Sequence, residues 1–174
     1  MSLHPQLDTA LKDGVFWITR RIGIGQFVSE TRCQCLLAAS VTHVLNVGEA
    51  ESLSSTTNSI QHVTDIPITD LQLIPVGTAE SCIRAIHDVM LLPDTKLFVH
   101  CIAGRNRSPT ILWLYLLACG MDGETAKQLI VERSPDAVPG HSSLVNEELI
   151  RAIKAFGSQQ AMASTDPSAL QPAY

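Results

Sequence analysis

Three successive patterns between residues 96 and 120 constrain the fold of this chain most strongly. Residues 96–99, Lys-Leu-Phe-Val, form a short, largely apolar and β-prone run, which predicts a buried strand. Residues 110–119 are apolar almost all round, which predicts a central helix, and Gly120 is placed to end it. The loop between them, residues 100–109, reads His-Cys-Ile-Ala-Gly-Arg-Asn-Arg-Ser-Pro. It must therefore join the carboxyl end of a strand to the N-terminus of a helix.

The end of this loop has the features of a helix start. Ser108 is a favourable N-cap residue, and Pro109 suits the first helical position, where its missing N–H costs nothing. The first N–H groups of a helix lack partners within it, and the helix dipole adds positive charge there. The loop is therefore predicted to bind a phosphate, which its backbone would surround through Ile102, Ala103, Gly104, Arg105 and Asn106.

Two side chains of the loop add chemistry to this anion site. The positive field of the helix terminus favours the thiolate form of Cys101, which is the nucleophilic form of a cysteine. Arg107 carries a planar fork of donors that can hold two phosphate oxygens at once. Ser108 has a second possible role besides capping, because its hydroxyl can donate a hydrogen bond to the cysteine sulfur. The loop therefore combines a phosphate site with its own nucleophile.

The loop also resembles a known family. His-Cys, five residues, and then Arg-Ser-Pro-Thr is similar to the signature of the cysteine-dependent protein tyrosine phosphatase superfamily, in its dual-specificity branch. The resemblance extends over roughly residues 13 to 156, through the segments 13–18, 41–47, 66–71, 131–135 and 139–140. It implies a metal-independent phosphatase that hydrolyses phosphate monoesters through a cysteinyl-phosphate intermediate.

The resemblance also implies a general acid upstream of the loop. Residues 66–71, Ile-Pro-Ile-Thr-Asp-Leu, are similar to the family segment that carries this acid, which makes Asp70, 31 positions before Cys101, the expected proton donor. Asp65 is the rival, but the alternating apolar pattern around it places it in a strand rather than in a mobile loop. In the resembling family the histidine before the cysteine hydrogen-bonds near it, so His100 is expected to be structural rather than a base.

Apolar patterns along the chain alternate between strand-like and helix-like segments. They predict strands at 16–19, 41–47, 62–68 and 96–99, and helices at 29–39, 78–92, 109–119, 122–133 and 142–156. Gly23-Ile24-Gly25 is too short for a dinucleotide fingerprint and is expected to be a turn. The alternation predicts an α/β fold, a single domain with a mainly parallel central sheet flanked by helices and a ligand site at the carboxyl ends of its strands.

The extent of the family resemblance, together with the composition of the tail, implies a division of the chain into three parts. Residues 1–12 are expected to form an N-terminal extension, 13–156 the catalytic domain, and 157–174 a disordered tail, because the tail is rich in Ser, Ala, Gln and Pro without periodicity. A length of 174 residues suits one domain. We expect a monomer.

Composition limits the function further. A net charge of −5 leaves no basic footprint for nucleic acid. No stretch has the roughly 18 uninterrupted apolar residues of a membrane span, and the N-terminus lacks the blocks of a signal peptide, so a cytoplasmic location is expected. The Cys33 and Cys35 pair has no second pair or histidine cluster to complete a metal site, so buried packing is favoured. No metal and no cofactor are expected.

The substrate is less constrained than the reaction. The chain lacks the extra N-terminal region of the larger tyrosine-specific relatives, so the resemblance implies a shallow cleft for phosphotyrosine and phosphoserine or phosphothreonine of proteins, with other small phosphate esters possible. Arg105 is similar to the second basic residue of lipid and inositol phosphatases, although these often have a lysine where this chain has Ile102. Asn106 is shared with members acting on RNA 5′-triphosphates. A non-catalytic phosphate-binding module is a further alternative, which the joint presence of Cys101, Arg107 and Asp70 disfavours.

Overall fold

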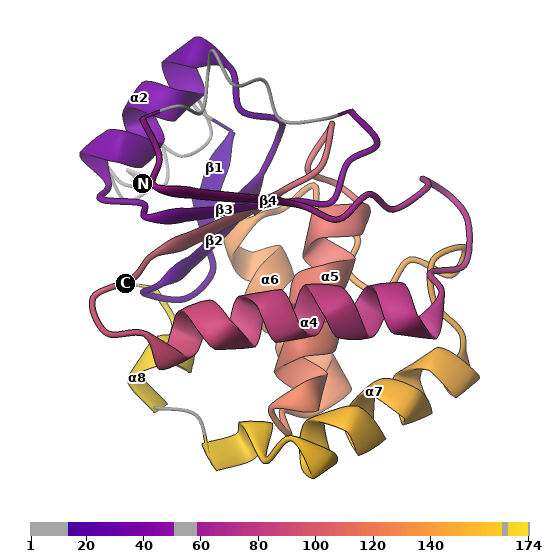
Figure 1. Cartoon of the computed structure of the whole chain (residues 1–174). Coiled ribbons are helices and arrows are strands. Elements are labelled where there is room, and N and C mark those ends of the chain that lie inside the picture. Colours follow the sequence, from indigo (N-terminus) through magenta and orange to yellow (C-terminus); the bar gives the residue numbers. More distant parts are fainter. Residues whose placement is uncertain (1–13, 51–58, 165–166, 174) are drawn as a thin grey trace, which may run out of the picture.

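The computed structural model describes residues 14–50, 59–164 and 167–173. Five strands form one sheet: β1 (Val15–Trp17), β2 (Ile22–Gly25), β3 (His43–Asn46), β4 (His62–Asp65) and β5 (Leu97–His100). The helices are α2 (Glu30–Ala38), α4 (Val76–Leu91), α5 (Arg107–Ala118), α6 (Gly123–Arg133), α7 (Glu147–Gln159) and α8 (Pro167–Leu170), with a 3₁₀ turn, η1 (Met162–Ser164), before the last. Figure 1 shows their arrangement around the sheet.

The strands lie in the order β1-β2-β5-β3-β4. β1 is antiparallel to β2, and every other pair of neighbours is parallel. All four residues of β5 are buried, as expected for a strand that pairs on both edges. The expected α/β fold with a mainly parallel sheet is therefore confirmed.

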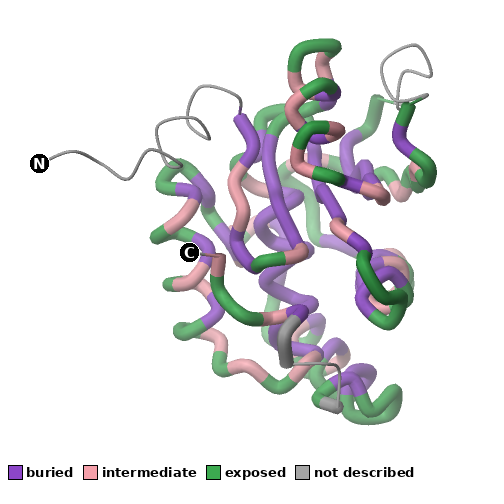
Figure 2. Tube along the Cα trace, turned by 90° about the vertical axis from the view of Figure 1, so that its left-hand side faces the viewer, coloured by how far each residue is buried: buried purple, intermediate pink, exposed green. Residues whose placement is uncertain are grey.

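Successive side chains of the central strands point to opposite faces of the sheet, which divides the core into two layers. Val44 of β3 and Phe98 of β5 are register partners and belong to the apolar cluster under α2. Their neighbours Leu45 and Val99 pair in the same way and belong to the larger cluster with α4 and α5. In Figure 1, α2 lies on one face of the sheet and α4, α5, α6 and α7 lie on the other. Figure 2 shows the buried segments, in purple, gathered in the interior and the exposed segments, in green, along the outside.

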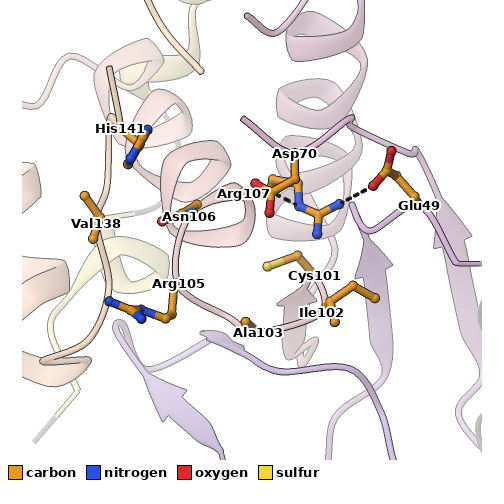
Figure 3. A pocket seen from close by; sticks show the side chains of 10 residues that line it. All are labelled: Glu49, Asp70, Cys101, Ile102, Ala103, Arg105, Asn106, Arg107, Val138 and His141. Atoms are coloured by element: carbon orange, nitrogen blue, oxygen red, sulfur yellow. Dashed lines mark ion pairs between the residues drawn. The ribbon is translucent and has the colours of Figure 1, made fainter. Parts of the chain in front are cut away.

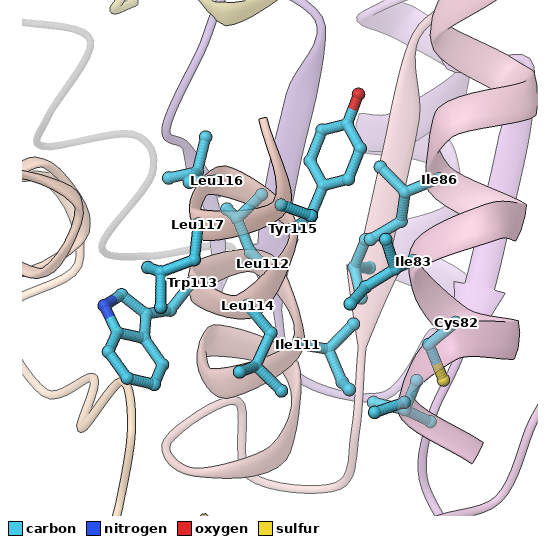
Figure 4. Packing of buried hydrophobic residues seen from close by; sticks show 14 of the residues in the cluster. Cys82, Ile83, Ile86, Ile111, Leu112, Trp113, Leu114, Tyr115, Leu116 and Leu117 are labelled. Carbon is cyan, nitrogen blue, oxygen red and sulfur yellow. The ribbon is translucent and has the colours of Figure 1, made fainter. Parts of the chain in front are cut away.

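Helix α5 is the centre of the larger layer. Every one of its residues is buried, as its almost wholly apolar sequence predicts. Figure 4 shows Ile111 and Tyr115 of α5 against Ile83 and Ile86 of α4. The helix ends at Ala118, and Gly120 follows its C-cap as expected: the φ of 89° at Gly120 and the hydrogen bond from its N–H to the Leu117 carbonyl close the last turn.

The segment expected to be a turn at Gly23-Ile24-Gly25 is instead part of strand β2. The glycines there serve close approach. A Cβ at Gly25 would overlap the carbonyl oxygen of Gly14, and one at Gly23 would lie 3.2 Å from the Trp17 ring. The turn prediction was wrong because glycine in a strand for packing reasons looks the same in a sequence as glycine in a turn.

The C-terminal part of the chain also differs from the expected disorder after residue 156. α7 begins at Glu147, where the Asn146 side chain caps it, and continues to Gln159. Met162 and Ala169 are buried in the larger core cluster, and Thr19 forms an isolated bridge with Pro172. The apolar packing of Met162 and Ala169, together with this backbone bridge, holds the described part of the segment on the domain. The expected extension at residues 1–12 lies outside the described residues.

No helix in the described ranges combines the length and apolar character needed to cross a membrane.

The close contact between α5 and α7 generates a stability prediction. A Cβ at Gly157 would overlap the carbonyl oxygen of Ala118 and lie 2.6 Å from its Cα, so Gly157→Ala must push the two helices apart. We expect a loss of at least about 1–3 kcal/mol of unfolding free energy, as in other overpacked cores. Gly77→Ala is the matched control, since nothing lies within 4 Å of a Cβ there. Urea unfolding of both variants measures the difference, and equal stabilities would contradict the packing described.

Candidate active site

The loop between β5 and α5 forms the floor of a pocket at the carboxyl end of the sheet (Figure 3). The lining residues are Glu49, Asp70, Cys101, Ile102, Ala103, Arg105, Asn106, Arg107, Val138 and His141. Gly104 turns the loop with a φ of 71°, and a Cβ there would lie 2.7 Å from the Gly25 backbone, so only glycine fits. Hydrogen bonds from Phe27 N to the Ile102 carbonyl and from Val138 N to the Arg105 carbonyl hold the loop on both sides. The pocket therefore rests on a fixed backbone.

The Cys101 thiol lies at the base of the pocket. Its residue is only 2% exposed, and its Sγ is 3.4 Å from the hydroxyl oxygen of Ser108. Ser108 is not the N-cap as expected, because α5 begins at Arg107, two residues before the expected start, and Asn106 occupies the cap position without a side-chain hydrogen bond. The Ser108 hydroxyl is therefore free to lie against the sulfur. Of its two expected roles, the structure supports the contact with the cysteine.

Arg107 is a buried cation between two carboxylates. Its Nη1 donates to the Ile68 carbonyl at 3.0 Å and lies 3.5 Å from Glu49 Oε2, while its Nε lies 3.6 Å from Asp70 Oδ1. The buried Nε donates no hydrogen bond to any described residue. Nε therefore has Asp70 as an ion-pair neighbour but no hydrogen bond, and because a buried donor without a hydrogen bond is costly, its N–H is available to an anion.

The structure separates the two candidate acids. Asp70 lines the pocket, and its Oδ1 accepts a hydrogen bond from Leu71 N at 3.0 Å. Asp65 lies at the end of strand β4, accepts a hydrogen bond from the Asn46 side chain at 2.7 Å, and is not part of the pocket lining. Asp70 therefore faces the pocket, whereas Asp65 is engaged by the Asn46 side chain at the end of its strand.

His100 lies beneath the loop rather than in the pocket. Its Nδ1–H donates to the Cys101 carbonyl at 3.1 Å. Burial lowers the pKa of His100, which keeps the ring neutral, and its Nε2 has no hydrogen-bond partner among the described residues. His100 therefore lies outside the pocket lining, and its structural role stays a prediction. Three residues expected at the site do not line the pocket: His100, Gly104 and Ser108.

Three lining residues were not predicted: Glu49, Val138 and His141. Glu49 closely follows the carboxyl end of β3, and this position in a parallel sheet was the one available signal. Val138 and His141 come from the segment before α7, which only the folded chain brings to the loop. Among the described residues no group of three or more His, Cys, Asp or Glu side chains could hold a metal ion. Of the two cysteines for which buried packing was expected, Cys33 is buried on α2 and Cys35 is only half-buried.

Comparisons with known proteins bear on what this pocket does. The family model described as "PTP-SAK: Swiss Army Knife protein, DSP-PTPase phosphatase domain" matches residues 19–167. A search of the curated proteins finds no significant match.

Several solved structures share the fold. The chain is similar to PTPMT1 in complex with PI(5)P, with a TM-score of 0.71, 18% identity, and coverage of 84% of this chain and 99% of that one. It is also similar to DUSP15, with a TM-score of 0.65, 23% identity, and coverage of 86% and 92%. A third is the human tyrosine phosphatase-like serine/threonine/tyrosine-interacting protein, with a TM-score of 0.66, 16% identity, and coverage of 84% and 97%. Since the family model matches most of the sequence, the chain belongs to the PTP-SAK family of DSP-PTPase phosphatase domains.

Proposed function

We propose that this protein hydrolyses phosphate monoesters on tyrosine and on serine or threonine of proteins, through a cysteinyl-phosphate intermediate and without a metal. One observation carries the proposal. The Cys101 thiol, the Nε of Arg107, which donates no hydrogen bond to any described residue, and the Asp70 carboxylate lie in one pocket at the N-terminus of α5. A nucleophile, a phosphate-holding cation and a proton donor are what such a reaction requires.

The first step forms a bond between sulfur and phosphorus. The Cys101 thiolate attacks the phosphorus atom in line with the ester oxygen, and the P–O bond breaks. Arg107 offers its Nε and Nη2 edge to two non-bridging oxygens, since Ile68 and Glu49 engage Nη1. The N–H groups at the start of α5 stabilise the remaining charge. Asp70 gives its proton to the leaving oxygen, so that the alcohol or phenol departs neutral.

The second step returns the enzyme to its starting state. Water attacks phosphorus while the Asp70 carboxylate accepts a proton from it. The P–S bond breaks, the electron pair returns to Cys101, and inorganic phosphate leaves. Ser108 lies 3.4 Å from the sulfur and can donate its hydroxyl proton as a hydrogen bond to the departing thiolate. This contact assigns Ser108 mainly to the second step.

The proposal also specifies the substrate class, which is phosphoproteins. The pocket is bordered by partly exposed apolar side chains, Ile102 at 43% and Val138 at 40%, which suit the flanks of a peptide. Dephosphorylation of phosphoinositides is the second candidate, because Arg105 lines the pocket and the PTPMT1 structure contains PI(5)P.

A substrate comparison tests the proposed class. We expect higher kcat/KM values for phosphotyrosine and phosphothreonine peptides than for dispersed phosphatidylinositol monophosphates, measured as phosphate release under the same conditions. Cys101→Ser is the blank for each substrate. If a phosphoinositide has a higher kcat/KM than every peptide, the substrate class is phosphoinositides and not phosphoproteins. Release from no substrate would favour a non-catalytic module.

The role of Asp70 yields a separate prediction. A general acid matters most for a poor leaving group, so Asp70→Asn is expected to slow alkyl phosphate hydrolysis by on the order of 10²–10⁴. An activated aryl phosphate, whose leaving group departs without a proton, should be slowed much less. Asp65→Asn is the matched control, since this carboxylate lies outside the pocket. A leaving-group-dependent loss in Asp65→Asn, with Asp70→Asn unaffected, would transfer the role to the strand residue.

A further inference from the structure

The wall of the pocket opposite Glu49 and Asp70 comes from a different part of the chain. Figure 3 shows Arg105, Val138 and His141 on this side, away from the two carboxylates beside Arg107. The segment is attached to the loop by the hydrogen bond from Val138 N to the Arg105 carbonyl, at 2.7 Å. Arg105 Nε in turn donates to the Asp136 carbonyl at 3.4 Å. The wall and the phosphate loop therefore form one unit.

The backbone around His141 is held firmly. Gly140 adopts a φ of 70° against the Trp113 ring, and its N–H donates to Thr110 Oγ1 at 3.0 Å. The His141 carbonyl accepts hydrogen bonds from Leu144 N at 2.9 Å and Val145 N at 3.2 Å. Little conformational freedom is therefore lost when this residue binds a partner.

One hydrogen bond determines which nitrogen of His141 carries the proton. The Ser143 backbone N–H donates to His141 Nδ1 at 3.2 Å, and the Ser143 hydroxyl oxygen lies 2.7 Å from the same atom. A backbone N–H can only donate, so Nδ1 is an acceptor and the proton of the neutral ring lies on Nε2. This Nε2–H forms no hydrogen bond with the described residues. The half-buried imidazole thus brings an unused donor to the pocket lining.

The distribution of charge indicates which ligand group this donor suits. Glu49 and Asp70 repel a second negative group on their side of the scissile phosphate. Arg105 and the His141 Nε2–H attract one on the other side, where a charge-assisted hydrogen bond is stronger than a neutral one. We propose that His141, with Arg105 beside it, forms a subsite for a second anionic group of the substrate. The proposal rests on the proposed function, under which this group is an acidic or phosphorylated side chain next to the phosphoresidue.

Matched phosphopeptides test the subsite. One series carries Glu at each flanking position in turn, a second carries phosphoserine there, and the reference carries Gln. We expect wild type to favour an anionic peptide over the reference by on the order of tenfold in kcat/KM, as for a hydrogen bond to a charged group. His141→Phe should reduce this ratio toward one, and His141→Gln, which keeps an N–H donor, should retain part of it. The preference should weaken as salt is raised.

Control measurements distinguish failure of the subsite proposal from failure of the proposed substrate class. His62→Phe replaces an exposed histidine on β4, outside the pocket, and should retain the wild-type ratio. Thermal unfolding verifies that each variant is folded, and p-nitrophenyl phosphate, which has no second anionic group, normalises the rates. Equal kcat/KM for anionic and neutral peptides in wild type, or an undiminished preference in His141→Phe, would overturn the subsite. Preference for phosphoinositides over all peptides would instead overturn the proposed substrate class. Glutamate and phosphoserine arms show which anion the subsite takes.

Discussion

The junction between β5 and α5 is the constraint on which the rest of the structure depends. Every residue of the strand and of the helix is buried, so the two ends of the loop between them cannot shift without disturbing both layers of the core. Gly104 brings the loop to within van der Waals contact of Gly25, and β2 in turn pairs with β5. The catalytic geometry is therefore a consequence of how a strand and a helix are packed.

The same junction buries Arg107, because this residue is the first of α5. A cation in that place is stable only beside groups that compensate its charge. A buried guanidinium needs nearby acceptors, and the Ile68 carbonyl, Glu49 and Asp70 provide them. All three come from the ends of β3 and β4 or from the segment after β4, so the sheet order sets the charge balance of the pocket. Its Nε lies 3.6 Å from Asp70 Oδ1 without donating a hydrogen bond, so this N–H is left to donate to a phosphate. Glu49 is half exposed, so its contribution to stability is small, about 0–1 kcal/mol.

The sequence predicted what depends on local pattern and missed what depends on packing. The apolar runs of β5 and α5, and Gly120 at the helix end, are readable because burial requires apolar residues and a helix needs a terminator. β2 was missed because its glycines serve close approach, and α5 begins at Arg107, two residues before the start predicted from a Ser108 cap. Glu49 and His141 reach the pocket through contacts between segments distant in the chain, and no local pattern marks such contacts.

Trapping the covalent intermediate tests the central claim most directly. In Ser108→Ala the hydroxyl 3.4 Å from the sulfur is lost, so departure of the thiolate should slow and the phosphorylated enzyme should accumulate. The variant is mixed with p-nitrophenyl phosphate, quenched in acid and analysed by peptide mass spectrometry. The account predicts one phosphate on the peptide that contains Cys101, and neither phosphate nor turnover in Cys101→Ser. Continued turnover by Cys101→Ser, or phosphate on another residue, would contradict it.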